Sequence, residues 1–388
     1  MTGPAREDGI PRLWPVLLLL APFQFIFGLV YSWGAISPAI HAQSGWSQRT
    51  LDLVFALTPL ALLPSVIGTG HLLQRIAPKT LLGLALGCFT LGGAAGLAWE
   101  EPMAFILGYS VLALGIGAGL STAACIALVS RLRPRAKGSL GGALLALYGM
   151  SSMSSAPLFA VLDGALGWRT ALATVWAAYA AAGWLAWLML PAATAPTAHR
   201  APRVSLAQAL RHRPLLWAML AVLAAAPLGS ASFAAVGHLA SALGYGASFG
   251  VLAVSMMAVG NGAGRLAFGM LADWRSAACS RNAVLGLNAL AAVLLLFALH
   301  GVGVLALAAY PVLIGLAFGG MAGKLPALAA HVADDGHADT AFGLLFGAFA
   351  FAGFLGPLVS AAVGMHRALQ GLAICAVAAA VLAVAMGR

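Results

Sequence analysis

Two cationic residues stand inside long apolar stretches of this 388-residue chain, where charged side chains are rare. At 1.5 Å per residue, Arg265 and Lys324 lie roughly 12 Å and 10 Å inside the ends of their predicted helices. A cation at such a depth in a membrane costs about 2.5–3.5 kcal/mol, so it normally faces a polar interior and has a partner. All ten acidic residues fall in predicted loops or at helix ends. The missing counter-charge could therefore be a bound anion.

The guanidinium group of Arg265 indicates which anion to expect. It is planar and presents parallel N–H donors that match the two oxygens of a carboxylate. We therefore predict a small organic mono- or dicarboxylate as the substrate, with Arg265 as its anchor and Lys324 as a second anchor. Two alternatives stay open. Arg265 could have a structural role, and Lys324 could extend along its four-carbon stem to the inner membrane surface.

Two sets of small or polar residues recur at helical spacing, so that each set shares one helix face. The sets are Gln24, Gly28 and Tyr31 in the first predicted helix, and Tyr148, Ser152 and Ser155 in the fifth. Gln24, Tyr31 and Tyr148 are predicted to contact the substrate, together with Asn261, one turn before Arg265. The alternative for both faces is hydrogen bonding between helices with packing of small residues.

The composition identifies the solvent around the elements that must position these residues. The chain is 62% hydrophobic and 8% charged, whereas about a quarter of the residues in a soluble domain are charged. The formal charge of +10 comes from basic residues between apolar runs, which is typical of a membrane protein. We therefore expect membrane lipid around the chain and no nucleic-acid partner. The four cysteines are far apart, so neither disulfides nor a metal site is expected, and no motif calls for a cofactor.

Twelve apolar stretches are each long enough to cross a membrane as a helix. They lie near 14–40, 50–69, 80–98, 103–129, 139–162, 169–191, 214–240, 247–271, 281–299, 302–329, 341–363 and 367–386. A polar linker at 192–213 divides them into an N-terminal half, 1–191, and a C-terminal half, 214–388. The sequence therefore predicts an all-α membrane protein with two six-helix halves.

The loop charges predict the orientation of these helices. Fifteen of the twenty Lys and Arg residues fall at the termini and in the alternate loops on the same side. Both termini should therefore be cytoplasmic, in the inner (plasma) membrane. The loop at 331–340 departs from this trend because it carries Asp334, Asp335 and Asp339, although acidic residues have little weight in this rule.

The two halves share features at an offset of about 200 residues, which indicates an internal repeat. The segment Gly70 to Arg75 after the second helix matches Gly269 to Arg275 after the eighth. Gly115 and Gly119 match Gly319 and Gly323, and Pro157 matches Pro357. Such repetition is typical of transporters built from two related halves.

The turns at 70–75 and 269–275 resemble the loop signature of the major facilitator superfamily, with Gln74 where Asp is usual. The resemblance implies two halves that rock about a central site. It also implies a latch on the inner side, formed by Gly70, Arg75, Gly269, Asp273 and Arg275. Within the superfamily, the segments 28–34 and 261–269 resemble those of oxalate/formate antiporters and monocarboxylate transporters.

These relatives place a substrate-binding arginine at the position of Arg265. Other functional residues of that group are missing here: helix 11 has no lysine, Asn261 replaces an aspartate, and Ala35 replaces a lysine in helix 1. The resemblance therefore does not support proton coupling through that aspartate–lysine pair. A coupling proton and a counter-anion both stay open.

The sequence thus predicts a monomeric secondary transporter of a small carboxylate. One alternative is a proton-driven exporter of amphipathic compounds, which the lack of a mid-membrane carboxylate disfavours. Another is a sensor that binds a carboxylate without moving it. An enzyme is not expected, because no clustered nucleophile, base or metal set is present outside the loop at 331–339.

Overall fold

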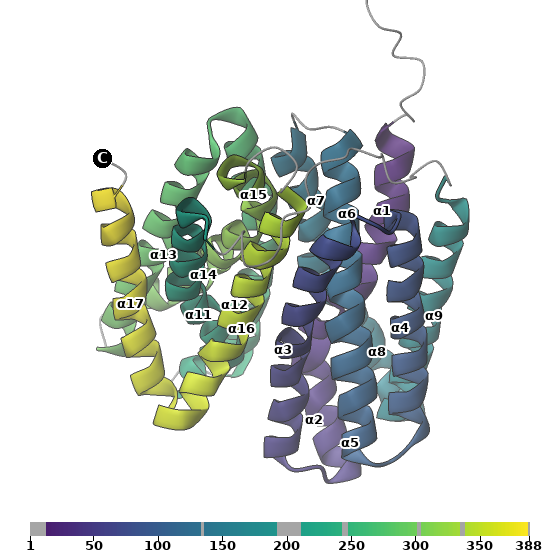
Figure 1. Ribbon diagram of the computed structural model, residues 1–388. Helices are drawn as coiled ribbons and strands as arrows, with labels where there is room; N and C mark the ends of the chain where they lie inside the picture. The colour runs from purple at the N-terminus through teal and green to yellow at the C-terminus, as the bar shows by residue number, and fades with distance from the viewer. Residues whose placement is uncertain are drawn as a thin grey trace, which may run out of the picture.

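The computed structural model describes residues 13–132, 136–191, 211–242, 247–300, 304–333 and 338–386. Every regular element within these ranges is a helix (Figure 1). This confirms the predicted all-α class. Most of the predicted linker, residues 192–210, lies outside the described residues.

The helices group into twelve consecutive segments at the predicted places. The first six segments are α1 (Leu13–Phe27) with η1 (Gly28–Ser32) and α2 (Trp33–Ser44), α3 (Gln48–Leu72), α4 (Pro78–Ala98), α5 (Pro102–Phe105) with η2 (Ile106–Gly117) and α6 (Ala118–Leu132), α7 (Lys137–Met150) with α8 (Ser152–Leu166), and α9 (Trp168–Met189). The second six are α11 (Arg213–Ala242), α12 (Ala247–Trp274), α13 (Ala277–Leu299), α14 (Val304–Gly323) with α15 (Leu325–Val332), α16 (Ala338–Val363) and α17 (Met365–Met386).

Many of these helices can cross a membrane by length and composition. Within the described ranges, eight pass this test alone, and the α14–α15 pair, bent by 43°, makes a ninth span. Shorter apolar helices cover Leu17–Ser32 and Met365–Val381. The chain is therefore a multi-pass membrane protein.

Three of the spanning segments contain a break in the α-helix, and Tyr31 and Lys324 lie at two of these breaks. Tyr31 lies in η1, the 3₁₀ turn between α1 and α2. That turn packs tightly on α7, because a Cβ added to Gly28 would lie 2.1 Å from the carbonyl oxygen of Tyr148. Ser151 separates α7 from α8, and Lys324 precedes α15, where a proline in the first turn favours a break from α14.

The helices of residues 13–189 and those of residues 213–386 pack as two bundles (Figure 1). The bundles meet along two seams, α3 with α16 and α7 with α12. A Cβ added to Gly138 would lie 2.5 Å from the oxygen of Gly269, so the α7–α12 backbones touch there. Past Ser151, α8 packs mainly on α2, α9 and η1, within its own bundle. The bundles are therefore joined mainly through the halves of these helices nearest the end where α1 begins and α17 ends (Figure 1).

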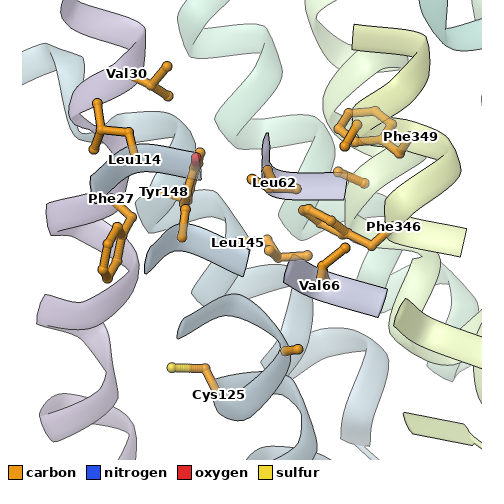
Figure 2. Close-up of a cluster of buried hydrophobic side chains, with 14 of the residues drawn as sticks. Phe27, Val30, Leu62, Val66, Leu114, Cys125, Leu145, Tyr148, Phe346 and Phe349 are labelled. Carbon is orange, nitrogen blue, oxygen red and sulfur yellow. The ribbon is translucent and has the colours of Figure 1, made fainter. Parts of the chain in front are cut away.

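Apolar side chains fill the space between the bundles. Figure 2 shows Leu62 and Val66 of α3 beside Phe346 and Phe349 of α16, all of them buried. Leu145 of α7 belongs to the same cluster. This cluster excludes water from the contact between the bundles on that side of the molecule.

Candidate substrate-binding site

Arg265 of α12 joins the two bundles at one buried point, with only 1% of its side-chain surface exposed. Its Nε donates a hydrogen bond to Oδ1 of Asn261 over 3.0 Å. One terminal nitrogen donates to the carbonyl oxygen of Leu145 over 2.9 Å, and the other donates to the hydroxyl of Tyr31 over 2.8 Å. The guanidinium carbon also lies 5.7 Å and 5.6 Å from the ring centres of Tyr31 and Tyr148. The structure thus brings together four of the predicted site residues.

The guanidinium retains capacity for a further ligand. It has five N–H donors, and the three hydrogen bonds use one on each nitrogen. Each terminal nitrogen therefore keeps one N–H. No carboxylate in the described part of the chain forms an ion pair with Arg265. The site is a buried cation with two free donors and no counter-charge among the described residues.

Aromatic rings extend from this cation into the second bundle. Tyr31 meets Tyr148 edge-on at 5.7 Å between ring centres, and Phe233 of α11 at 6.0 Å. Phe233 in turn meets Phe318 of α14 at 5.6 Å, and Phe318 lies 4.9 Å from Phe349. An apolar surround of this kind lowers the local dielectric and strengthens the interaction of Arg265 with an anion.

Gln24 and Ser155 differ from their neighbours on the predicted faces. Gln24 is fully buried and is not one of the hydrogen-bond partners of Arg265. It therefore shares α1 with the site without touching Arg265. Ser155 of α8 forms a hydrogen bond with Ser32 of η1, which is the interhelical packing weighed as the alternative for that face.

The Lys324 side chain forms no hydrogen bond with the residues of this constellation. No hydrogen bond or ion pair joins its ammonium group to Arg265 or to any other described residue. Its exposed fraction is 2%, so the side chain is covered by protein and does not extend to the surface. Among the described residues, the Lys324 and Arg265 side chains therefore share no hydrogen-bond partner.

Asp273 makes the most extensive of the predicted latch contacts. Its Oδ1 accepts a hydrogen bond from the backbone N–H of Gly138 over 2.9 Å. Its Oδ2 accepts from the N–H and the hydroxyl of Ser139, over 2.6 Å and 2.7 Å. A carboxylate of α12 thus caps the first turn of α7 in the other bundle, where free N–H groups and the helix dipole favour negative charge.

The second seam is closed by a matching set of contacts. A Cβ added to Gly70 of α3 would lie 2.8 Å from the oxygen of Asp339 at the start of α16. Gln74 donates to the hydroxyl of Thr340 over 3.4 Å, and Arg131 forms an ion pair with Asp339 at 3.2 Å. Sequence reasoning treated Arg131 and Asp339 only as loop charges, because nothing in their spacing shows that the two loops meet.

The other two predicted latch residues make no such contact. Arg75 is exposed, and its side chain has no hydrogen bond or ion pair with any described residue. Arg275 is also exposed, and its guanidinium carbon lies 5.6 Å from the ring centre of its neighbour Trp274. Of the predicted set, Gly70, Gly269 and Asp273 are therefore the members that lie at the seams.

Comparisons with known proteins agree with this architecture. The family model of the Major Facilitator Superfamily matches residues 18–357. The fold is similar to the crystal structure of a Major Facilitator Superfamily transporter, FucP, in the outward conformation, with a TM-score of 0.71, 17% identity, and coverage of 95% of this chain and 97% of that one. It is also similar to a variant of the E. coli fucose:proton symporter FucP, with a TM-score of 0.70, 15% identity and the same coverage.

At these identities the similarity to the two FucP structures shows the fold alone, and a search of curated proteins finds no significant match. Since the family model covers most of the chain, the protein belongs to the Major Facilitator Superfamily.

Proposed function

We propose that this protein is a secondary transporter of a small organic carboxylate, and that Arg265 binds the carboxylate group. The observation that carries the proposal is the state of Arg265: buried, without a counter-charge in the described part of the chain, and with one free N–H on each terminal nitrogen. A carboxylate can accept both of these donors. An unpaired guanidinium in a membrane protein is costly, so a bound anion would offset part of that cost.

The contacts of Arg265 suggest how binding is coupled to movement. It belongs to the second bundle and donates to Tyr31 and Leu145 of the first. If the bundles separate at this level, those two hydrogen bonds break and their donors lose their acceptors. A carboxylate on Arg265 replaces the lost acceptors, so it would lower the free energy of the separated state more than that of the closed state.

We further propose that the moving units are residues 1–191 and 214–388, and that the seams at Asp273 and Asp339 form the cytoplasmic latch. The excess of basic residues at the termini and in the loops on this side supports its cytoplasmic placement. In this arrangement the described contacts close the cytoplasmic side, so the substrate would enter from the outside.

Lys324 forms no hydrogen bond with the described residues around Arg265, which favours a monocarboxylate as the substrate. Lys324 makes no described contact with the site, so a second carboxylate would lie among Tyr31, Tyr148 and Phe233 without a charged partner. The resemblance of segments 28–34 and 261–269 to monocarboxylate transporters and oxalate/formate antiporters supports the same class.

The first test is thermal stabilisation of the purified protein in detergent, across a panel of formate, acetate, lactate, oxalate, neutral sugars and amphipathic cations. We expect a monocarboxylate to stabilise the parent protein and Arg265→Lys less, and to leave Arg265→Ala unaffected. Arg169→Ala is the matched control, because Arg169 donates to the carbonyl oxygens of Leu97 and Trp99, away from the site. Stabilisation by neutral or cationic compounds alone would overturn the proposal.

Flux in liposomes then separates transport from sensing. The stabilising carboxylate should accumulate in vesicles that contain the parent protein and not in vesicles that contain Arg265→Ala. A protein that binds the carboxylate but gives no flux would be a sensor, and the proposed transport function would then be wrong.

A further inference from the structure

A cavity lies between α4 and α9 of the first bundle and shares no lining residue with the partners of Arg265. Figure 1 shows these two helices side by side at the edge of the bundle. The cavity has a volume of about 410 Å³, which lies in the range of small-molecule sites, roughly 300–1,000 Å³. Its lining residues, one cation and no carboxylate among them, are Ala77, Lys79, Thr80, Gly83, Leu84, Trp184 and Trp187. This charge favours an anionic ligand.

The cation, Lys79, is held in place by the end of α9. Its ammonium group donates a hydrogen bond to the carbonyl oxygen of Leu190, the C-cap residue, and lies 5.2 Å from the ring centre of Trp187. A lysine ammonium has three N–H donors, and this hydrogen bond uses one of them. No carboxylate in the described part of the chain forms an ion pair with Lys79. The ammonium group therefore retains two donors for an anion.

Two tryptophans of α9 form an aromatic wall of the cavity. Trp187 packs on Gly83, where an added Cβ would lie 2.9 Å from its Nε1, and that Nε1 donates to the carbonyl oxygen of Lys79 over 2.9 Å. Trp184 donates to Oγ1 of Thr90 over 3.0 Å and meets Trp187 edge-on at 5.6 Å between ring centres. Hydrogen bonds to α4 thus fix both rings, which present their apolar surface to the cavity.

The polarity of the cavity changes along α4. Lys79 and Thr80 lie in the first turn of this helix, which has no side-chain cap, so its N–H groups and dipole favour negative charge there. Leu84 lies about one turn further into the helix, roughly 7 Å away at 1.5 Å per residue. It is exposed, as is Leu185 of α9 at a similar depth. A fitting ligand therefore has an anionic end at the first turn of α4 and an apolar part beyond it.

We propose that this cavity binds an anionic phospholipid, with its phosphate at Lys79 and Thr80 and the start of an acyl chain along Leu84 and Trp184. Both α4 and α9 are long and apolar enough to cross a membrane, so lipid is the solvent at their exposed faces. The cavity lies where α4 begins and α9 ends, at the level where headgroups and tryptophan side chains meet. Basic pockets between helices at this level bind anionic headgroups.

The first experiment compares ligands that share or lack this chemistry. Purified protein in detergent is titrated with short-chain phosphatidylglycerol and with phosphatidylcholine of the same chain length, and bound lipid is followed by native mass spectrometry. We expect saturable phosphatidylglycerol binding that is about tenfold tighter than phosphatidylcholine binding. Inorganic phosphate should compete poorly, because it lacks the apolar part. Equal binding of the two lipids would overturn the proposal, and so would inorganic phosphate that competes as well as the lipid does.

A charge variant locates the headgroup. Lys79→Gln should weaken phosphatidylglycerol binding about tenfold. Arg275→Gln is the matched control, because Arg275 is also a cation beside a tryptophan, Trp274, but is exposed and lines no part of this cavity. It should bind the lipid like the parent protein. If the two variants have equal affinities, Lys79 does not bind the headgroup and the proposal is wrong.

A second variant tests the cavity without a change of charge. Ala77→Leu places a larger side chain in the cavity and keeps the contact of Lys79 with Leu190, so it should weaken lipid binding in a folded protein. Parental affinity in Ala77→Leu would show that the lipid binds elsewhere. Both variants should keep carboxylate stabilisation through Arg265, so the result is independent of the proposed function.

Discussion

The guanidinium of Arg265 donates a 2.8 Å hydrogen bond to the hydroxyl of Tyr31, across 234 residues of sequence and from one bundle to the other. Tyr31 lies in the short 3₁₀ turn between α1 and α2, which Gly28 holds against α7. The predicted anion anchor is therefore positioned by a residue of the opposite bundle. The direction in which its free N–H groups point therefore depends on the position of the two bundles relative to each other.

We predict that Tyr31→Phe weakens binding of the stabilising carboxylate by about tenfold to a hundredfold, because a hydrogen bond that orients a charged group contributes about 1.5–3 kcal/mol. The aromatic ring and the fold should be retained. Isothermal titration calorimetry measures the affinity. Tyr179→Phe is the control, since the Tyr179 hydroxyl has no hydrogen-bond partner among the described residues and its ring packs on Phe25. Equal affinities for the two variants would contradict a positioning role for Tyr31.

Removal of the Asp273 carboxylate should favour opening of the side where the seams lie. Asp273→Ala leaves the first turn of α7 without its cap, and such a loss costs about 0.5–2 kcal/mol. Asp273→Asn should have a smaller effect, because an amide oxygen can still accept one hydrogen bond. Spin labels at the exposed positions Arg75 and Arg275, in a background without the native cysteines, report the separation of the bundles by pulsed electron resonance.

The control for the latch prediction is Asp163→Ala. Asp163 accepts a hydrogen bond from Gln43 inside the first bundle, so its loss does not touch a seam. We expect longer label distances for Asp273→Ala and unchanged distances for Asp163→Ala. Identical distance distributions in the two variants would show that Asp273 does not hold the seam closed.

Gly319→Ala should destabilise the protein by about 1–3 kcal/mol or more, because the added Cβ would lie 2.0 Å from the backbone oxygen of Asn261. That contact forces α14 away from α12, next to Arg265. Gly286→Ala is the matched control on α13, where a Cβ meets nothing within 4 Å. It should be neutral or stabilising by up to about 1 kcal/mol. Thermal unfolding in detergent measures both, and similar melting temperatures would refute the close approach.

Two buried tyrosines should respond in opposite ways to loss of the hydroxyl. Tyr310 of α14 forms a hydrogen bond with Ser232 of α11, whereas the Tyr109 hydroxyl has no partner in the described part of the structure. Tyr310→Phe should therefore lose about 0.5–1.5 kcal/mol, and Tyr109→Phe should lose nothing or gain stability. Thermal unfolding distinguishes these outcomes; a larger loss for Tyr109→Phe would show that its hydroxyl has a partner after all.

Hydropathy alone located the helices of this protein. The twelve predicted stretches match the twelve helical segments within a few residues at most ends, because lipid requires every spanning segment to be a long apolar helix. The same scarcity of charge singled out Arg265 and Lys324 as candidate site residues. These features depend on the local sequence, so no knowledge of packing was needed to find them.

Packing decided what those residues contact. Helical spacing placed Tyr31 and Tyr148 on the faces of separate helices, and only the tertiary structure joins them at Arg265. It also buries Lys324, links Asp273 to the start of α7, and pairs Arg131 with Asp339. Each of these contacts depends on how one helix is rotated and how deep it sits beside another. Hydropathy does not encode either quantity, because lipid can surround any apolar face of a helix equally well.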